Sequence, residues 1–140
     1  MYNTNALRIM EIIDEGLLNS VSESACKSPR LRMNYNFHKS VDAKAQRLLN
    51  AMEPGTVMPV HRHQNTEETY ILIRGSLRVF FYNDKQELIE TGRLNLQEGK
   101  YGINIPVGQW HTIEVLESGT IILEVKEGPY RPLKAEDILK

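Results

Sequence analysis

The sequence predicts a single all-β domain, a sandwich or barrel, with one α-helix in front of it. Its 140 residues, 41% hydrophobic and 25% charged, are enough for one domain with a buried core. After residue 30, about eight to ten short segments of strand character follow one another at regular spacing, separated by glycine, proline and asparagine turns. No internal repeat or low-complexity segment interrupts this pattern.

Composition argues against several classes of partner and setting. The net charge is −1, from 17 basic and 18 acidic residues, and no basic block indicates nucleic-acid binding. No run of about 18 apolar residues predicts a membrane span, and the N-terminus lacks a signal-peptide pattern. The single cysteine, Cys26, rules out an internal disulfide and fits a reducing compartment, so we expect a cytoplasmic protein. We also expect Cys26 to be a small buried side chain.

The N-terminal region is expected to contain a helix. Residues 6–13, ALRIMEII, fit either a strand or the first turns of a helix. Asp14 is a typical N-cap, and an apolar stripe follows it, consisting of Leu17, Leu18, Val21 and Ala25. Pro29 ends this helix at about Ser28. We therefore divide the chain into residues 1–30 (strand and helix packed on the barrel), 31–132 (the β-barrel) and 133–140 (a C-terminal tail with a short helical turn).

The first barrel strand, within residues 30–40, has an unusually polar second face. Its apolar face carries Met33, Tyr35 and Phe37, and its polar face carries Asn34, Asn36 and His38. Exposure to solvent and the wall of a polar cavity both explain that polar face. Further strands are expected at residues 70–73, 76–82, 87–90, 101–105, 111–116 and 120–125. The last two are expected to pair with each other around the Ser118-Gly119 turn.

The segment from Gly55 to Gly75 carries the chemistry. His61 and His63 are one residue apart, so in a strand both imidazoles lie on one face. Of the adjacent acids Glu67 and Glu68, which point to opposite faces, Glu68 is the preferred partner. His111 lies some forty residues further on, at the start of another expected strand. In a small antiparallel barrel the inward faces of the strands converge, so these four side chains can meet.

Three imidazoles and one carboxylate form a ligand set for one divalent transition metal ion. Zinc, iron(II), manganese, nickel and copper all suit these donors, and no sulfur ligand biases the choice. An octahedral ion held by all four would keep two positions open, whereas a tetrahedral ion would be filled by them. The sequence does not assign catalytic residues.

The spacing of these residues carries a family resemblance. Gly55-x5-His61-x-His63-x4-Glu68-x6-Gly75 is similar to the first cupin motif, and Pro106-x-Gly108-x2-His111, preceded by Gly99, resembles the second. Two departures are a gap after Gly99 that is one residue longer than usual and Val115 in place of the frequent asparagine. The resemblance implies a small single-domain cupin barrel, a double-stranded β-helix or jelly roll.

Longer stretches resemble the WbuC family of cupin-fold metalloproteins. They are SPRLRMNYNFH, RLLNAMEPGT, IPVGQWHT and EVKEGPY, and the similarity extends over residues 13–130. The family is associated with bacterial O-antigen gene clusters, so the resemblance implies a role in surface polysaccharide biosynthesis. The resemblance implies a fold and a metal site rather than an activity. Two hypotheses follow from the ligand set: a metal-dependent enzyme (isomerase, epimerase or dioxygenase) acting on a sugar or another small polar molecule, and a non-catalytic binding protein. The presence of all four ligands argues against a third, a metal-free sugar epimerase.

The expected ligand contacts come from two parts of the chain. They are Asn34, Asn36 and His38 on the polar face of the first barrel strand, and Trp110 beside His111. The assembly we expect is a homodimer formed through sheet edges, as is frequent among cupins.

Overall fold

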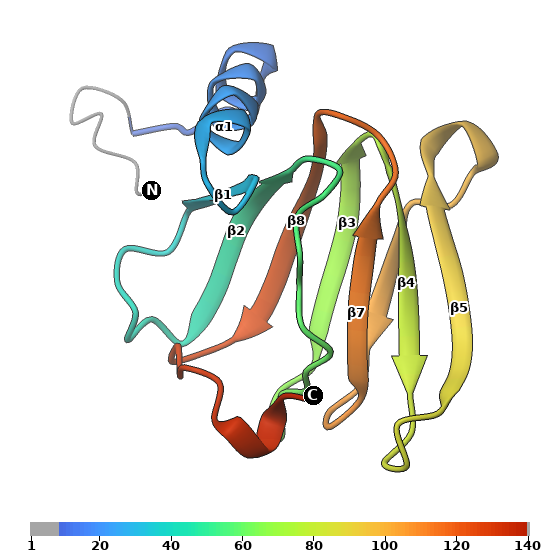
Figure 1. The fold of residues 1–140 in the computed structure, drawn as a ribbon. Coiled ribbons are helices and arrows are strands. Elements are labelled where there is room, and N and C mark those ends of the chain that lie inside the picture. The colour runs from blue at the N-terminus through green and yellow to red at the C-terminus, as the bar shows by residue number, and fades with distance from the viewer. Residues whose placement is uncertain (1–8, 140) are drawn as a thin grey trace.

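The computed structural model describes residues 9–139 and consists of two antiparallel β-sheets and one α-helix (Figure 1). This arrangement confirms the predicted small jelly-roll fold with a helix in front. The elements are α1 (Glu15–Lys27), β1 (Arg32–Asn36), β2 (Ala45–Met52), β3 (Glu68–Arg74), β4 (Ser76–Tyr82), β5 (Leu88–Asn95), the 3-10 helix η1 (Leu96–Glu98), β6 (Gly102–Ile105), β7 (Trp110–Val115), β8 (Thr120–Glu127) and the 3-10 helix η2 (Ala135–Asp137).

The two sheets have strand orders β1-β2-β8-β3-β6 and β5-β4-β7. The chain passes from the first sheet to the second at Gly75, between β3 and β4, and returns to the first sheet between β5 and β6. It enters the second sheet again between β6 and β7 and returns once more between β7 and β8. The expected pairing of residues 111–116 with 120–125 is therefore wrong, because β7 pairs with β4 while β8 lies between β2 and β3. Ile113 of β7 and Ile122 of β8 belong to the same core. The short turn at Ser118-Gly119 is thus a corner between the sheets.

The main core lies between the two sheets. Buried apolar side chains from both sheets form it, namely Met52, Tyr70, Leu72, Leu77, Val79, Leu94, Ile105, Ile113, Val115 and Ile122. Because side chains alternate along each strand, the same inward faces continue past this core to polar residues at one end of the first sheet. That polar end holds the candidate site.

Helix α1 begins and ends where the sequence predicts. The side chain of Asp14 accepts a hydrogen bond from the backbone N–H of Leu17 at 2.9 Å, and Ser28 is the C-cap. Helix α1 lies beside β1 and β2 of the first sheet (Figure 1). Its buried stripe forms a second core with the outer face of that sheet, consisting of Leu18, Val21, Ala25, Leu49, Ala51 and Ile121. Cys26 is exposed, so its expected burial is wrong. It lies one position past Ala25 and therefore about 100° around the helix from the buried stripe.

The structure agrees with the prediction at the C-terminal end of the chain but not at residues 9–13. Residues 9–13 form neither helix nor strand, and the rest of the expected segment 6–13 lies outside the described residues. The helical turn expected in the C-terminal tail is confirmed as η2. In the described part of the chain, no helix has the length and apolar character needed to cross a membrane.

Candidate metal site

The segment that carries His61 and His63 is not a strand, contrary to the expectation. Within residues 56–67, strand-like pairing is confined to His61, which forms one isolated β-bridge with His111 and another with Ile138. The backbone N–H of His61 donates to His111 O (3.0 Å), and that of His111 donates to His61 O (2.8 Å). Further along, Arg62 N–H donates to Asp137 O (3.1 Å) and Gly108 N–H to His63 O (2.8 Å). The partners change at each residue, so no continuous ladder forms.

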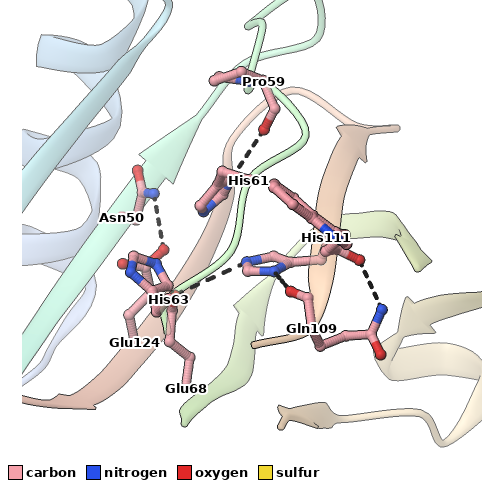
Figure 2. Close-up of polar contacts among 9 residues, drawn as sticks. Asn50, Pro59, His61, His63, Glu68, Gln109, His111 and Glu124 are labelled. Carbon is pink, nitrogen blue, oxygen red and sulfur yellow. Dashed lines mark hydrogen bonds and ion pairs between the residues drawn. The ribbon is translucent and has the colours of Figure 1, made fainter. Parts of the chain in front are cut away.

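Backbone carbonyls orient two of the three imidazoles. Nδ1 of His61 lies 2.9 Å from the carbonyl of Pro59, and Nδ1 of His111 lies 2.9 Å from that of Gln109 (Figure 2). A carbonyl only accepts hydrogen bonds, so Nδ1 carries the proton in both rings. The Nε2 lone pairs are therefore left for another partner, as in most histidine metal sites.

The remaining donor atoms converge on one place. Ligand atoms of His61, His63, Glu68 and His111 all lie within 4.8 Å of one another. Nε2 of His63 contacts Oε1 of Glu68, and Nε2 of His111 lies 3.9 Å from the same oxygen. Nε2 of His111 is buried and has no hydrogen-bond partner among the described residues. A buried polar atom without a partner is costly, and a cation between these donors would satisfy it. The cluster therefore supports a bound metal ion.

Burial and mutual contact set the charges of these groups. Burial lowers the pKa of His61 to about 4, and the neighbouring His111 adds to this effect. Burial also lowers the pKa of His111. For Glu68, burial raises the pKa, but the hydrogen bond and charge of His63 outweigh it, so that the pKa falls below its usual range. Neutral imidazole and ionised carboxylate are the forms that bind metal ions.

The structure separates the two neighbouring acids. Glu68, the first residue of β3, is buried and points to the cluster. Glu67 is exposed, and its carboxylate accepts a hydrogen bond from Nδ2 of Asn104 at 3.1 Å. The preferred residue of the pair is thus the one that the fold brings to His61, His63 and His111.

A cavity of about 480 Å³ opens beside the cluster. Asn34, Asn36 and His38 line it, so the polar face of β1 and the residues after it form a cavity wall. Nδ1 of His38 lies 3.1 Å from the backbone N and O of Arg47. Trp110 does not line this cavity. Its indole Nε1–H donates to Oδ1 of Asp84 (2.9 Å), and the Arg62 guanidinium lies 4.4 Å from its ring centroid.

Sequence reasoning did not identify several cavity residues on β2 and β8. These are Gln46, Asn50, Glu124 and Lys126. Burial, assisted by the charge of Glu68, raises the pKa of the Glu124 carboxyl to about 7, and Nδ2 of Asn50 donates to its Oε1 at 3.3 Å (Figure 2). The sequence pattern that could have identified them is the alternation of side chains between the two faces of a strand. Gln46-x3-Asn50 and Glu124-x-Lys126 place polar residues at inward positions of β2 and β8.

The sequence also did not predict that the C-terminal segment contributes to the site, because residues 133–140 were expected to form only a tail. The carboxylate of Asp137, which is buried, accepts hydrogen bonds from Nε of Arg62 (3.1 Å) and Nε2 of Gln64 (2.6 Å). The backbone N–H of Leu139 donates to Val60 O (2.8 Å). This segment therefore holds the residues on either side of His61 and His63.

The solved structures most similar to this chain include cupins. The chain resembles CapF from Staphylococcus aureus, a capsular polysaccharide assembling protein (22% identity, TM-score 0.55, covering 69% of this chain and 26% of that chain). It resembles KdgF from a Halomonas species (16% identity, TM-score 0.57, covering 74% and 84%). It also resembles the cupin domain of Cnp3 from Schizosaccharomyces pombe (12% identity, TM-score 0.55, covering 69% and 64%). The chain spans about a quarter of the length of CapF.

These similarities establish the cupin fold and go no further, because all three identities are low. No curated protein matches the chain. One family model matches, described as a domain of unknown function (DUF6016), and the match covers residues 13–94. That range is more than half of the chain and contains His61, His63 and Glu68. The chain is therefore a cupin-fold protein that belongs to the DUF6016 family.

Proposed function

We propose that this chain is a metal-dependent enzyme of the WbuC type that acts on a small polar molecule, a sugar or sugar nucleotide. In this proposal, His61, His63, Glu68 and His111 hold one divalent transition metal ion: zinc, iron, manganese or nickel. The observation that carries it is the convergence of four donor atoms within 4.8 Å beside an open, polar cavity. A buried cluster without such a cavity would suit a structural ion instead.

Each group of residues has a separate part in this proposal. A bound divalent ion supplies Lewis-acid or redox chemistry at the cluster. The carbonyls of Pro59 and Gln109 hold His61 and His111 with Nε2 inward. Asn34, Asn36 and His38 orient the substrate from the opposite wall. Glu124 and Tyr70 line the same cavity, and each carries a group able to hold a proton at its oxygen atoms.

The substrate class rests on the resemblance to the WbuC family and its association with O-antigen gene clusters. The structural neighbour CapF is described as a capsular polysaccharide assembling protein, which agrees with a sugar substrate. That similarity concerns the fold alone, and the experiment below tests the sugar directly. In keeping with the composition and the fold, we propose a homodimer in the cytoplasm as the working form.

The experiment begins with metal analysis of protein purified without an affinity tag. The metal-free protein is then loaded with each of the four metals and incubated with a panel of sugar nucleotides, with product followed by mass spectrometry and oxygen uptake recorded for the iron form. We expect about one metal ion per chain and turnover with one metal. Binding of a sugar without turnover under any metal would favour the non-catalytic binding protein. Protein that takes up no metal would refute both.

A further inference from the structure

We infer that the ligand of the cavity is anionic: a hydroxylated small molecule whose carboxylate or phosphate group is bound by Arg30 and Arg32. This inference rests on the proposed function, because it names the substrate class of the same site. Both arginines line the cavity that contains His61, His63 and Glu68. The ligand would reach from the metal cluster at one end of the cavity to the arginines at the other.

The register of the first sheet places the charges along the cavity. Lys126 is opposite Glu68 on one side and Gln46 on the other, so this row lies at the metal cluster. The next inward row contains Tyr70, Glu124 and Leu48. Arg32 is opposite Met52, which is six residues further along β2 than Gln46. Arg32 is therefore displaced along the strand direction from the metal row, and its charge acts on Glu124, which lies between.

The balance of charge in the cavity favours an anion. Three cationic side chains line it, Arg30, Arg32 and Lys126, against the two carboxyls of Glu68 and Glu124. Glu68 already belongs to the metal cluster, where a divalent ion would add further positive charge. A cavity with an excess of positive charge attracts anionic ligands.

The surroundings of the Arg32 guanidinium favour binding of an anion. Its guanidinium is partly buried, and burial together with the neighbouring Arg30 lowers its pKa. The hydrogen bond it forms is to a neutral group, from Nη1 to the backbone carbonyl of Val57 at 3.3 Å. Neither Arg30 nor Arg32 forms an ion pair with any of the described residues. A carboxylate or phosphate would supply the paired charge, and the planar guanidinium binds both in a bidentate manner.

The backbone between the two arginines is strained. Leu31 has a φ of 58°, in the left-handed region that a branched side chain rarely adopts. The turn is fixed by hydrogen bonds from Leu31 N–H to Ser28 O (3.0 Å) and from Glu53 N–H to Leu31 O (2.9 Å). Such strain is concentrated at functional sites. Here both Arg30 and Arg32 line the same cavity, although Leu31 between them adopts an unfavourable backbone conformation.

The rest of the wall suits hydroxyl groups. Four carboxamide side chains line the cavity, those of Asn34, Asn36, Gln46 and Asn50. A carboxamide offers both donors and an acceptor, as does a hydroxyl, so the two match in many orientations. The volume of about 480 Å³ lies within the range of small-molecule sites.

The test measures binding of three probes to the metal-loaded protein by titration calorimetry at low ionic strength. The probes are glucose, glucuronate and glucose 1-phosphate, which share a ring of hydroxyls and differ in anionic group. We expect at least one of the two anions to bind about tenfold or more tightly than glucose. The anion that binds more tightly identifies the acid as carboxylate or phosphate. Equal affinity for all three probes, or no binding of either anion, would overturn the inference.

Variants of the arginines make the test specific. Arg32→Gln should remove the preference for the anion, and Arg32→Lys should retain part of it because the charge remains. Arg47→Gln is the matched control, since Arg47 is exposed and does not line the cavity. Loss of the preference in the Arg47 variant, or its retention in Arg32→Gln, would contradict the assignment. Metal content and turnover are recorded on the same samples, so a failure of the proposed function is seen separately from a failure of the anion preference.

Discussion

The imidazole of His111 is fully buried, yet its Nε2 has no hydrogen-bond partner among the described residues. The orphaned atom faces Glu68, and the other ring nitrogen is committed to the carbonyl of Gln109. An isolated buried imidazole in this position would destabilise the fold, whereas a ligand to a metal ion would not. The environment of this one residue thus argues for the metal more strongly than its place in a motif does.

We predict that His111→Ala lowers metal affinity by at least about tenfold without unfolding the barrel, because one of the four donors is lost. Metal content after dialysis against a weak chelator, measured by mass spectrometry, checks this, with circular dichroism to confirm the fold. Glu67→Ala is the matched control, because this exposed acid is adjacent to Glu68 and outside the cluster. Unchanged metal stoichiometry in the His111 variant would refute the assignment of the ligands.

Glu124 gives a second prediction at the scale of a residue, in the metal-free protein. Its folded-state pKa is raised from 4.5 to about 7 by burial and by the charge of Glu68. The folded state therefore binds more protons than the unfolded state between these two values, so stability falls as the pH rises through this window. Above pH 7 the full cost of the buried charge is present, about 3 kcal/mol.

Replacing the charge with a neutral amide should remove that cost. We predict that Glu124→Gln raises the melting temperature at pH 8 by several degrees and changes it little at pH 4. The amide oxygen can still accept the hydrogen bond from Asn50. Thermal unfolding in the presence of a chelator at both pH values provides the measurement. A variant that is less stable at pH 8 would mean that the charge is compensated in the folded state.

At the scale of elements, the C-terminal 3-10 helix η2 and the residues after it are part of the site. Asp137 binds the side chains of Arg62 and Gln64, and Leu139 pairs with Val60, so both flanks of the His61-x-His63 segment are tied down. That segment has no strand ladder of its own. Its position therefore depends on contacts supplied from the end of the chain.

We predict that Asp137→Ala weakens metal binding by about tenfold, although Asp137 is not among the four clustered residues. The loss of its two side-chain hydrogen bonds frees Arg62 and Gln64, and the histidine between them loses its fixed position. Competition with a chromogenic chelator measures the affinity. Glu136→Ala, at the exposed neighbouring position, should leave the affinity unchanged. An equal loss in both variants would show that the segment acts by general stability alone.

The elements also show where sequence reasoning succeeds and where it cannot. Helix α1 was predictable from the sequence, because its limits are set locally by Asp14 and Pro29. The strand expected at His61 and the hairpin expected at Ser118-Gly119 were wrong, because strand pairing depends on partners that are distant in sequence. Asp137 was missed for the same reason, since its role depends on residues more than seventy positions away.

At the scale of the whole molecule, the site forms because the chain crosses between the two sheets and brings residues of both together. His111 comes from the second sheet and Glu68 from the first, while His61 lies in the loop that bridges to His111. The spacing of motifs predicted this meeting of four residues. The wall formed by Glu124 and Lys126 was not predicted, because strand β8 returns to the centre of the first sheet only in the folded chain.

The last prediction concerns Gly75, where the chain passes from the first sheet to the second. Gly75 joins β3 to β4 with a φ of 80°, and a Cβ atom added there would lie 2.8 Å from Cα of Thr120, a backbone atom that cannot move aside easily. Thr120 begins β8 directly after the crossing from β7, and Ser76 N–H donates to its hydroxyl at 3.3 Å. Two of the four points where the chain changes sheets are therefore packed against each other, and Gly75 allows this close approach.

We predict that Gly75→Ala destabilises the metal-free protein by about 3 kcal/mol, through conformational strain and the clash with Thr120. Gly119→Ala is the matched control. Gly119 has a similar φ of 78°, but an added Cβ there would meet no atom within 4 Å, so only the conformational cost of about 1 kcal/mol is expected. Urea unfolding followed by the fluorescence of buried Trp110 measures both variants. Equal destabilisation would mean that the sheets can separate at Gly75, and that the crossing does not determine how closely they pack.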